Sequence, residues 1–344
     1  MGNFYEKSRA MMIKSPDEYG KYKEIIDSLK WTDSAQSYFR YAPNIEEALS
    51  ILEMSECIGK ESDLEKYMGY IIEVIKYHTP DFKLADQNAL QTQKWDEIIF
   101  GPNVPEATHQ WYGHFVASLF KLQVREQFWS DHNNKTGRTL EFLSSPDSAI
   151  RYSVITLNYD MVLEGIADAI SPRFITPNKL AFQKEAIIQT PDPFPALAKV
   201  HGSVGDGKII PMTANKGLYQ VEMPESWKLA YNLLKEANQI RIIGYSMPST
   251  DSYIKYLLKA AIGQRRELNK IDVICREDKD RTVRNRYFDF LKTDNVRFKA
   301  DFVENYLGKN YNNRVSHIID QDGKKTLRFD ALEKSHEEFF TQNL

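Results

Sequence analysis

Three short apolar runs in the second half of the chain each stop at polar residues or glycine. The runs span residues 153–157, 196–200 and 239–243. Their β-branched and aliphatic side chains are typical of buried strands. Because the carboxyl ends of parallel strands line one crevice in an open α/β sheet, we expect the residues at these three ends to meet around one ligand. The polar and glycine residues at the ends are Asn158, Asp160, His201, Gly202 and Gly244.

Strand-like and helix-like patterns alternate from residue 150 to about residue 298. Residues 271–274 are predicted to form a fourth strand, and apolar residues at helical spacing follow the strand-like runs. We predict helices over residues 160–170, 225–237, 251–262 and 280–291. Alternation of this kind is typical of a parallel sheet. The sequence therefore predicts an α/β fold, in which a Rossmann-like parallel sheet flanked by helices occupies residues 146–300.

The chain before this core has the apolar spacing of helices. We predict helices over residues 45–57, 63–78 and 107–128, the first of them capped by Asn44. We therefore expect a mainly helical subdomain at residues 1–145, which packs on the core or is inserted in it.

The chain after the core has the pattern of a small hairpin followed by a helix. Residues 315–319 and 326–329 are strand-like and flank the turn signal Asp322-Gly323. Residues 330–340 have a helical pattern. We therefore expect a C-terminal hairpin and helix, which make up a third part at residues 301–344.

Composition excludes several classes of protein. The 344 residues carry a formal net charge of −3, which gives no overall basic attraction for nucleic acid. The apolar stretches are much shorter than the roughly 20 residues that span a bilayer, and the N-terminus lacks a signal-peptide core. We therefore expect a soluble, cytoplasmic protein that does not bind membranes. The two cysteines, Cys57 and Cys275, cannot form a four-cysteine zinc ribbon, so we expect no structural zinc.

The segments at the three strand ends resemble, in this order, the motifs of the sirtuin-like family, above all its bacterial antiviral branch that consumes NAD. The resemblance covers residues 152–277, with a weaker similarity at residues 44–50. It implies that Asn158 holds the nicotinamide ribose and a water, and that His201 is the general base. The candidate NAD-binding residues in the same segments are Thr156, Tyr159, Asp160, Gly202, Ser203, Gly244 and Ser246.

Two positions depart from the sirtuin-like pattern. The resemblance implies a strand and a Gly-Ala-Gly turn whose backbone amides bind the pyrophosphate, and this sequence has no such turn. Either the natural protein begins some tens of residues earlier or the turn has been lost, and we favour the earlier start. The residue expected near the adenosine is Cys275, whose thiol is a poor hydrogen-bond partner for a ribose hydroxyl.

The polar residues of these segments suit both chemical and structural roles. The amide of Asn158 can orient a water or a ribose hydroxyl, and the imidazole of His201 is a usable base at neutral pH. Asp160 either orients one of these residues or caps the helix that follows. Thr250 and Asp251 are expected to cap the helix that begins after them.

We therefore expect an NAD+ hydrolase that releases nicotinamide and ADP-ribose and depletes cellular NAD as an antiphage effector. An NAD-dependent protein deacylase is the second candidate, although zinc-ribbon deacylases need cysteine pairs that this chain lacks. A catalytically silent nucleotide-binding scaffold is the third, favoured by the missing glycine turn and by Cys275. The resemblance further implies a homo-oligomer that pairs with a HerA-type ATPase, with nucleic acid involved only indirectly.

Overall fold

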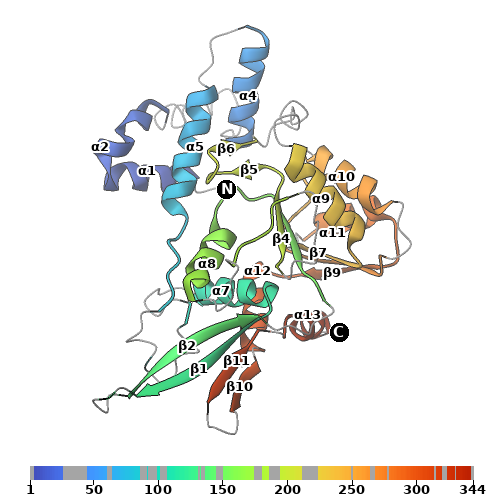
Figure 1. Cartoon of the computed structure of the whole chain (residues 1–344). Coiled ribbons are helices and arrows are strands. Elements are labelled where there is room, and N and C mark those ends of the chain that lie inside the picture. The colour runs from blue at the N-terminus through green and yellow to red at the C-terminus, as the bar shows by residue number, and fades with distance from the viewer. Residues whose placement is uncertain are drawn as a thin grey trace.

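The computed structural model of the chain is a mixed α/β structure (Figure 1). It describes residues 4–25, 45–59, 64–85, 91, 99–100, 107–130, 132, 136–144, 150–173, 180–185, 194–210, 224–248, 251–263, 268–276, 279–313, 315–319, 324–329 and 331–341. The predicted caps and turn residues outside these ranges are Asn44, Thr250, Asp322 and Gly323. None of the helices in the described ranges combines the length and the apolar character needed to cross a bilayer.

Helices form the N-terminal part, at the top of Figure 1. They are α1 (Phe4–Lys14), α2 (Pro16–Tyr19), α4 (Ile45–Cys57) and α5 (Leu64–His78), with a 3-10 turn at Gly20–Tyr22. The predicted helices over residues 45–57 and 63–78 are confirmed by α4 and α5. Tyr70 and Val74 of α5 are buried and pack with Tyr22 in one apolar cluster, which holds these helices together.

Helix α7 (Ala107–Leu119) is shorter than predicted. The prediction of a helix over residues 107–128 is wrong beyond residue 119, because the chain there enters strand β1 (Leu122–Ser130), which pairs with β2 (Thr136–Ser144). Lys121 has a left-handed backbone conformation, with φ of 52°, which is a common way to end a helix.

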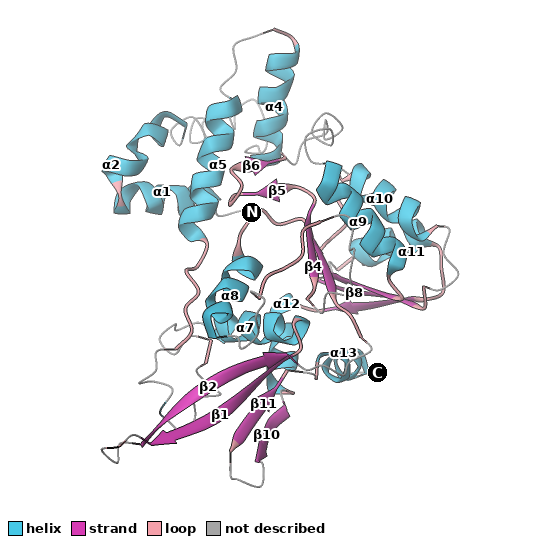
Figure 2. Ribbon diagram, in the orientation of Figure 1, coloured by secondary structure: helices cyan, strands magenta, loops and turns pink. Residues whose placement is uncertain are grey.

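The antiparallel sheet joins strands from distant parts of the chain (Figure 2). Its order is β10-β11-β1-β2, where β10 is Val315–Ile319 and β11 is Lys325–Arg328. Leu122, Val124 and Glu126 of β1 are buried in alternation, which is the period of two that a strand requires. The strands of the predicted C-terminal hairpin are confirmed, and β11 pairs directly with β1.

The parallel strands occur in two groups. Strand β3 (Ser153–Thr156) pairs with β4 (Ala196–Lys199). Strand β7 (Gln239–Ile243) pairs with β8 (Lys270–Cys275), which pairs with β9 (Val296–Ala300). In the part of the chain that the structure describes, no backbone ladder joins the first group to the second. The predicted Rossmann-like parallel strands are therefore present as two half-sheets.

Helices follow the parallel strands in alternation. They are α8 (Val162–Ile170), α9 (Pro224–Glu236), α10 (Ser252–Ile262), α11 (Thr282–Leu291) and α12 (Val303–Asn312). The predictions of the first four are confirmed. Ala198 of β4 and Ile271 of β8 belong to one buried cluster with Leu229 of α9 and Tyr287 of α11. The two half-sheets thus share one apolar core.

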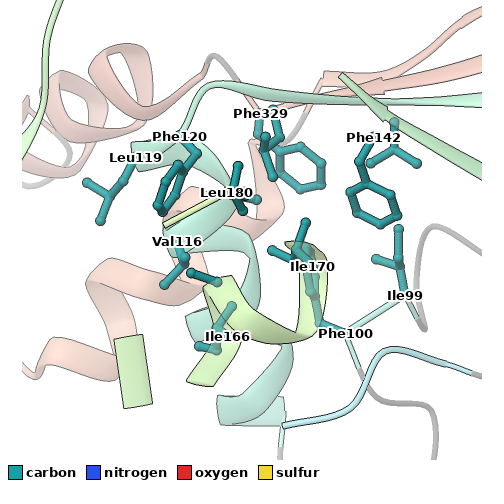
Figure 3. Packing of buried hydrophobic residues seen from close by; sticks show 14 of the residues in the cluster. Ile99, Phe100, Val116, Leu119, Phe120, Phe142, Ile166, Ile170, Leu180 and Phe329 are labelled. Atoms are coloured by element: carbon teal, nitrogen blue, oxygen red, sulfur yellow. The ribbon is translucent and has the colours of Figure 1, made fainter. Parts of the chain in front are cut away.

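A second core lies between the antiparallel sheet and helices α7 and α8 (Figure 3). Phe142 lies in β2, Phe329 directly follows β11, and Phe120 lies in the turn between α7 and β1. Ile166 and Ile170 come from α8. All five side chains are buried. Helix α8, which begins soon after β3 ends, is therefore fixed to the antiparallel sheet.

Buried charges hold the last helix, α13 (Leu332–Thr341), to the parallel strands. Arg297 of β9 donates from Nε and Nη2 to the two carboxylate oxygens of Asp272 in β8, at 2.6 and 2.7 Å. The Nε2 of His336 donates to Asp272 Oδ2 at 2.7 Å, and the Asp272 side chain is only 1% exposed. Burial opposes the ionisation of Asp272, but the bonds from Arg297 and His336 outweigh it and lower its pKa to about 2. Burial lowers the pKa of His336, which favours its neutral form.

One carboxylate of α13 bridges the two half-sheets. The hydroxyl of Tyr152, which directly precedes β3, donates to Glu333 Oε1 at 2.9 Å. Nη2 of Arg241 in β7 donates to Glu333 Oε2 at 2.5 Å. Burial raises the pKa of Tyr152, so its hydroxyl keeps the proton that it donates.

Candidate active site

The first candidate segment leaves the carboxyl end of β3. Thr156 ends the strand, and its Oγ1 accepts a hydrogen bond from the backbone N–H of Asn158 at 3.1 Å. Asn158 is exposed. Its side-chain amide is therefore available to a ligand at this edge of the sheet.

The second candidate segment leaves the carboxyl end of β4 and places His201 in the interior. The imidazole is 0% exposed, and its Nδ1 lies 3.2 Å from the carbonyl oxygen of Leu157. Because a carbonyl only accepts, Nδ1 carries the proton in the neutral ring, and Nε2 is the nitrogen with a lone pair. The contact gives His201 the tautomer that a general base needs at Nε2.

A glycine is required directly after His201. Gly202 has φ of 82°, and an added Cβ would lie 2.4 Å from the carbonyl oxygen of Lys208. This close approach lets strand β5 (Gly202–Ser203) pair with β6 (Lys208–Ile209). The hairpin therefore folds back beside the histidine.

Tyr159 lies against His201. The two ring centroids are 6.1 Å apart, and the Tyr159 hydroxyl donates to the carbonyl oxygen of Ile210 at 2.6 Å. The backbone N–H of Val204 donates to the Tyr159 carbonyl at 3.0 Å. The segments after β3 and β4 are thus joined to each other. Because the His201 ring is 0% exposed, a substrate reaches it only if the groups around the ring move.

The candidate residues Asp160 and Ser203 have structural contacts. Asp160 Oδ1 accepts from the backbone N–H of Val162 at 3.1 Å, at the start of α8, as the capping interpretation predicts. Ser203 is buried, and its hydroxyl contacts the sulfur of Met161 at 2.9 Å.

Asp251 occupies the N-cap position of α10, as predicted, but the expected capping by its side chain is wrong. Asp251 precedes the helix, but its side chain makes no capping hydrogen bond. It is buried, and Oδ2 accepts from the hydroxyl of Tyr245 at 3.2 Å. The carboxylate thus supports the segment that follows β7 instead of the helix.

The third candidate segment leaves the carboxyl end of β7 through Gly244, whose φ is 73°. Helix α11 holds the next two carbonyls. The Tyr287 hydroxyl donates to the carbonyl of Tyr245 at 2.6 Å, and Nη1 of Arg286 donates to the carbonyl of Ser246 at 3.1 Å. The path of the backbone at Gly244 and Ser246 is therefore fixed from the helix side.

All three strand ends reach one apolar cluster. Val200 and Met247 are buried members of this cluster, and Leu157 packs against it. The first two segments are joined by hydrogen bonds, and the third meets them through the cluster. Cys275, the last residue of β8, is also a buried member, at 4% exposure. The three segments thus lie over one shared core, and the meeting of their polar residues around one ligand stays a prediction.

Sequence reasoning missed a buried ion pair beside this site. Lys199, the last residue of β4, lies 3.1 Å from Oε1 of Glu164 in α8, measured from Nζ. The only sequence signal is a lysine inside the apolar run over residues 196–200. A lysine at such a position is buried only when it is paired.

A separate group of possible metal ligands lies away from the strand ends. Asp272, His336 and Glu337 place one ligand atom each within 4.8 Å of one another. Cationic side chains already bind these carboxylates. Arg297 contacts both, and Lys270 Nζ lies 2.5 Å from Glu337 Oε1. We interpret the group as an ion network that holds α13.

Residues 152–299 match the SIR2-like domain family. The matched range is less than half of the chain, and it contains all the candidate site residues and both parallel half-sheets except Ala300, the last residue of β9. The SIR2-like match supports the resemblance to the sirtuin-like family and a Rossmann-like core. No curated protein and no solved structure matches the chain.

SIR2-like domains bind NAD, and the residues at the strand ends fit a dinucleotide in part. Asn158 offers an exposed amide, whereas the position of a Cβ on Gly244 lies only 3.0 Å from Cγ2 of Val303 in α12, so the glycine serves the close approach of that helix. The buried His201 ring and the lack of a Gly-Ala-Gly turn do not match an open NAD site. The match nonetheless fits a protein that uses NAD.

Proposed function

We propose that the protein is an NAD+ hydrolase that releases nicotinamide and forms ADP-ribose, and that it acts as an antiphage effector by depleting cellular NAD. The observation that carries this proposal is the placement of Asn158 and His201 at the ends of the paired strands β3 and β4, inside the range that matches the SIR2-like domain. Leu157 and Tyr159 link the two ends directly.

These residues suit cleavage of the bond between nicotinamide and ribose. Such cleavage passes through an oxocarbenium-like state and needs a positioned water. The Asn158 amide would orient the water or a ribose hydroxyl, and Nε2 of His201 would accept the proton of the water. Because the ring is buried, we include in the proposal that the junction of Tyr159 with Ile210 opens when NAD binds.

The proposal extends to assembly as a homo-oligomer that pairs with a HerA-type ATPase. An apolar stripe on α4 supports an interface on this part of the chain. Ile51, Met54 and Ile58 lie at helical spacing on or just beyond this helix and are 60%, 61% and 60% exposed. A stripe of this kind is typical of a surface that another protein covers.

The experiment measures NAD loss and separates the products by chromatography, for the wild type and for Asn158→Ala and His201→Ala, with and without a candidate ATPase. We expect nicotinamide and ADP-ribose in equal amounts. Loss of a positioned base lowers a rate by about 10²–10⁴-fold, which corresponds to roughly 3–5 kcal/mol of barrier. Glu225→Gln, at an exposed pair with Lys228, is the control and should keep full turnover.

A nucleotide-binding scaffold is the second candidate function, and the full burial of His201 favours it. Calorimetric titration with NAD distinguishes the two functions. Binding of NAD without turnover in every combination, by a folded chain, would refute the hydrolase and support the scaffold.

A further inference from the structure

Lys199 carries a buried charge beside the candidate site. Its side chain is 7% exposed, and that of its partner Glu164 is 9% exposed. The Nζ of Lys199 also donates to the carbonyl oxygen of Asp160 and lies 3.8 Å from the sulfur of Met161. Burial of an ammonium costs several kcal/mol unless charged and polar groups surround it, so these contacts are a condition for the residue to lie here.

The contacts of Lys199 link the two segments that carry the candidate catalytic residues. Lys199 is opposite Thr156 in the ladder of β3 and β4, and it precedes His201 by two residues. Its acceptors belong to Asp160 and Glu164, which follow Asn158 by two and six residues. One ammonium group therefore bridges the end of β4 to the turn that follows β3.

We propose that Lys199 is a positioning residue, whose ammonium fixes the turn over residues 158–161 and so sets Asn158 relative to His201. This inference rests on the proposed NAD+ hydrolysis. Asn158 is exposed, and its backbone N–H donates to Thr156 within the same segment. Lys199 therefore fixes the place of the turn relative to β4 together with the bonds that Tyr159 makes to Val204 and Ile210.

The exposed Lys184 provides a matched control. Its Nζ lies 3.9 Å from the same oxygen of Glu164, but its side chain is 51% exposed. Lys184→Met removes a lysine from the same carboxylate without emptying a buried position. Any effect found only in Lys199→Met therefore comes from the buried contacts and not from a change of charge near Glu164.

Steady-state kinetics of NAD hydrolysis is the first part of the test. Displacement of a reacting group by about 1 Å costs about 100-fold in rate, so we expect Lys199→Met to lower kcat by about 100-fold. KM should change little, because Lys199 does not contact the substrate in the proposal. Lys184→Met should change neither constant. Equal kcat values for Lys199→Met and the wild type would overturn the proposal.

A double variant separates positioning from folding. Lys199→Met with Glu164→Leu replaces the buried pair by apolar side chains, which is expected to restore the thermal midpoint that Lys199→Met alone lowers. Under the proposal kcat stays low in the double variant. If kcat recovers together with the thermal midpoint, Lys199 acts only on stability and the proposal is wrong.

Hydrogen exchange gives a readout that does not depend on turnover. We expect amides at residues 158–163 to exchange faster in Lys199→Met and in the double variant than in the wild type and Lys184→Met. If the wild type does not cleave NAD, the hydrolase proposal fails. Hydrogen exchange alone then tests whether Lys199 fixes the turn over residues 158–161. Unchanged exchange at residues 158–163 would then overturn the role of Lys199, and faster exchange would uphold it.

Discussion

Replacement of Arg297 by Met perturbs the buried ion network beneath α13. The guanidinium makes two hydrogen bonds to Asp272, at 2.6 and 2.7 Å, and two to Glu337, at 2.9 and 3.1 Å. It also lies 4.4 Å from the centre of the Phe340 ring. Met keeps much of the apolar volume and removes every charged contact. The change therefore isolates the electrostatic part of the interaction.

The expected cost follows from the unequal burial of the partners. Removal of one member of a buried pair costs about 3–5 kcal/mol, because it leaves an uncompensated charge. Asp272 is 1% exposed and cannot regain water, whereas Arg297 is 34% exposed and already keeps part of its hydration. We therefore expect Arg297→Met to lower the free energy of unfolding by about 3 kcal/mol, the lower end of this range.

Urea unfolding at pH 7, followed by circular dichroism, measures this cost. The second variant combines Arg297→Met with Asp272→Leu, which removes the uncompensated charge and should recover part of the loss. Exposed pairs contribute about 0–1 kcal/mol. The reasoning is refuted if Arg297→Met costs no more than about 1 kcal/mol, the value of an exposed pair. It is also refuted if Asp272→Leu adds a further loss, because the buried carboxylate then does not depend on Arg297.

Two further predictions concern the stability of the fold at low pH and the glycines of the hairpin formed by β5 and β6. The pKa of Asp272 in the folded state is about 2, below its ordinary value of 3.8, so its carboxylate stabilises the fold above pH 3.8. About 2 kcal/mol should be lost as the pH falls from 3.8 to about 2. A pH series of urea unfolding should show a smaller loss in Asp272→Asn, where Glu337, whose pKa Arg297 also lowers to about 2, still titrates. Gly202→Ala places a Cβ 2.4 Å from Lys208 O and should cost about 3 kcal/mol in thermal unfolding. Gly207→Ala, with φ of 68° and no atom within 4 Å of the added Cβ, should cost only about 1 kcal/mol.

The parallel strands were predictable because burial leaves a local signal. Residues 196–199 are all buried in β4, and such a strand needs a continuous apolar run that sequence alone displays. The polar residues that end each run also mark where the strands stop. Both features depend on neighbours within a few residues, so the strands and the places where they end could be anticipated.

Strand β1 and the burial of His201 could not be predicted in the same way. Val124 of β1 lies opposite Leu327 of β11, and the residues near position 124 give no sequence signal for pairing with a strand so far along the chain. His201 is covered because Tyr159 and the hairpin after Gly202 fold back on it. Contacts between distant segments decide both features, and the periodicity of one segment does not contain them.

The carboxylate that bridges the half-sheets has a consequence for protein synthesis. Tyr152 and Arg241 are translated long before Glu333, and chains generally fold from the N-terminus as they are made. Both half-sheets are therefore translated before their common partner exists. A nonsense mutation just before residue 332 would preserve every parallel strand but would leave Arg241, whose side chain is 15% exposed, without its partner Glu333. We expect such a product to be a target of cellular proteases even though its candidate site residues are intact.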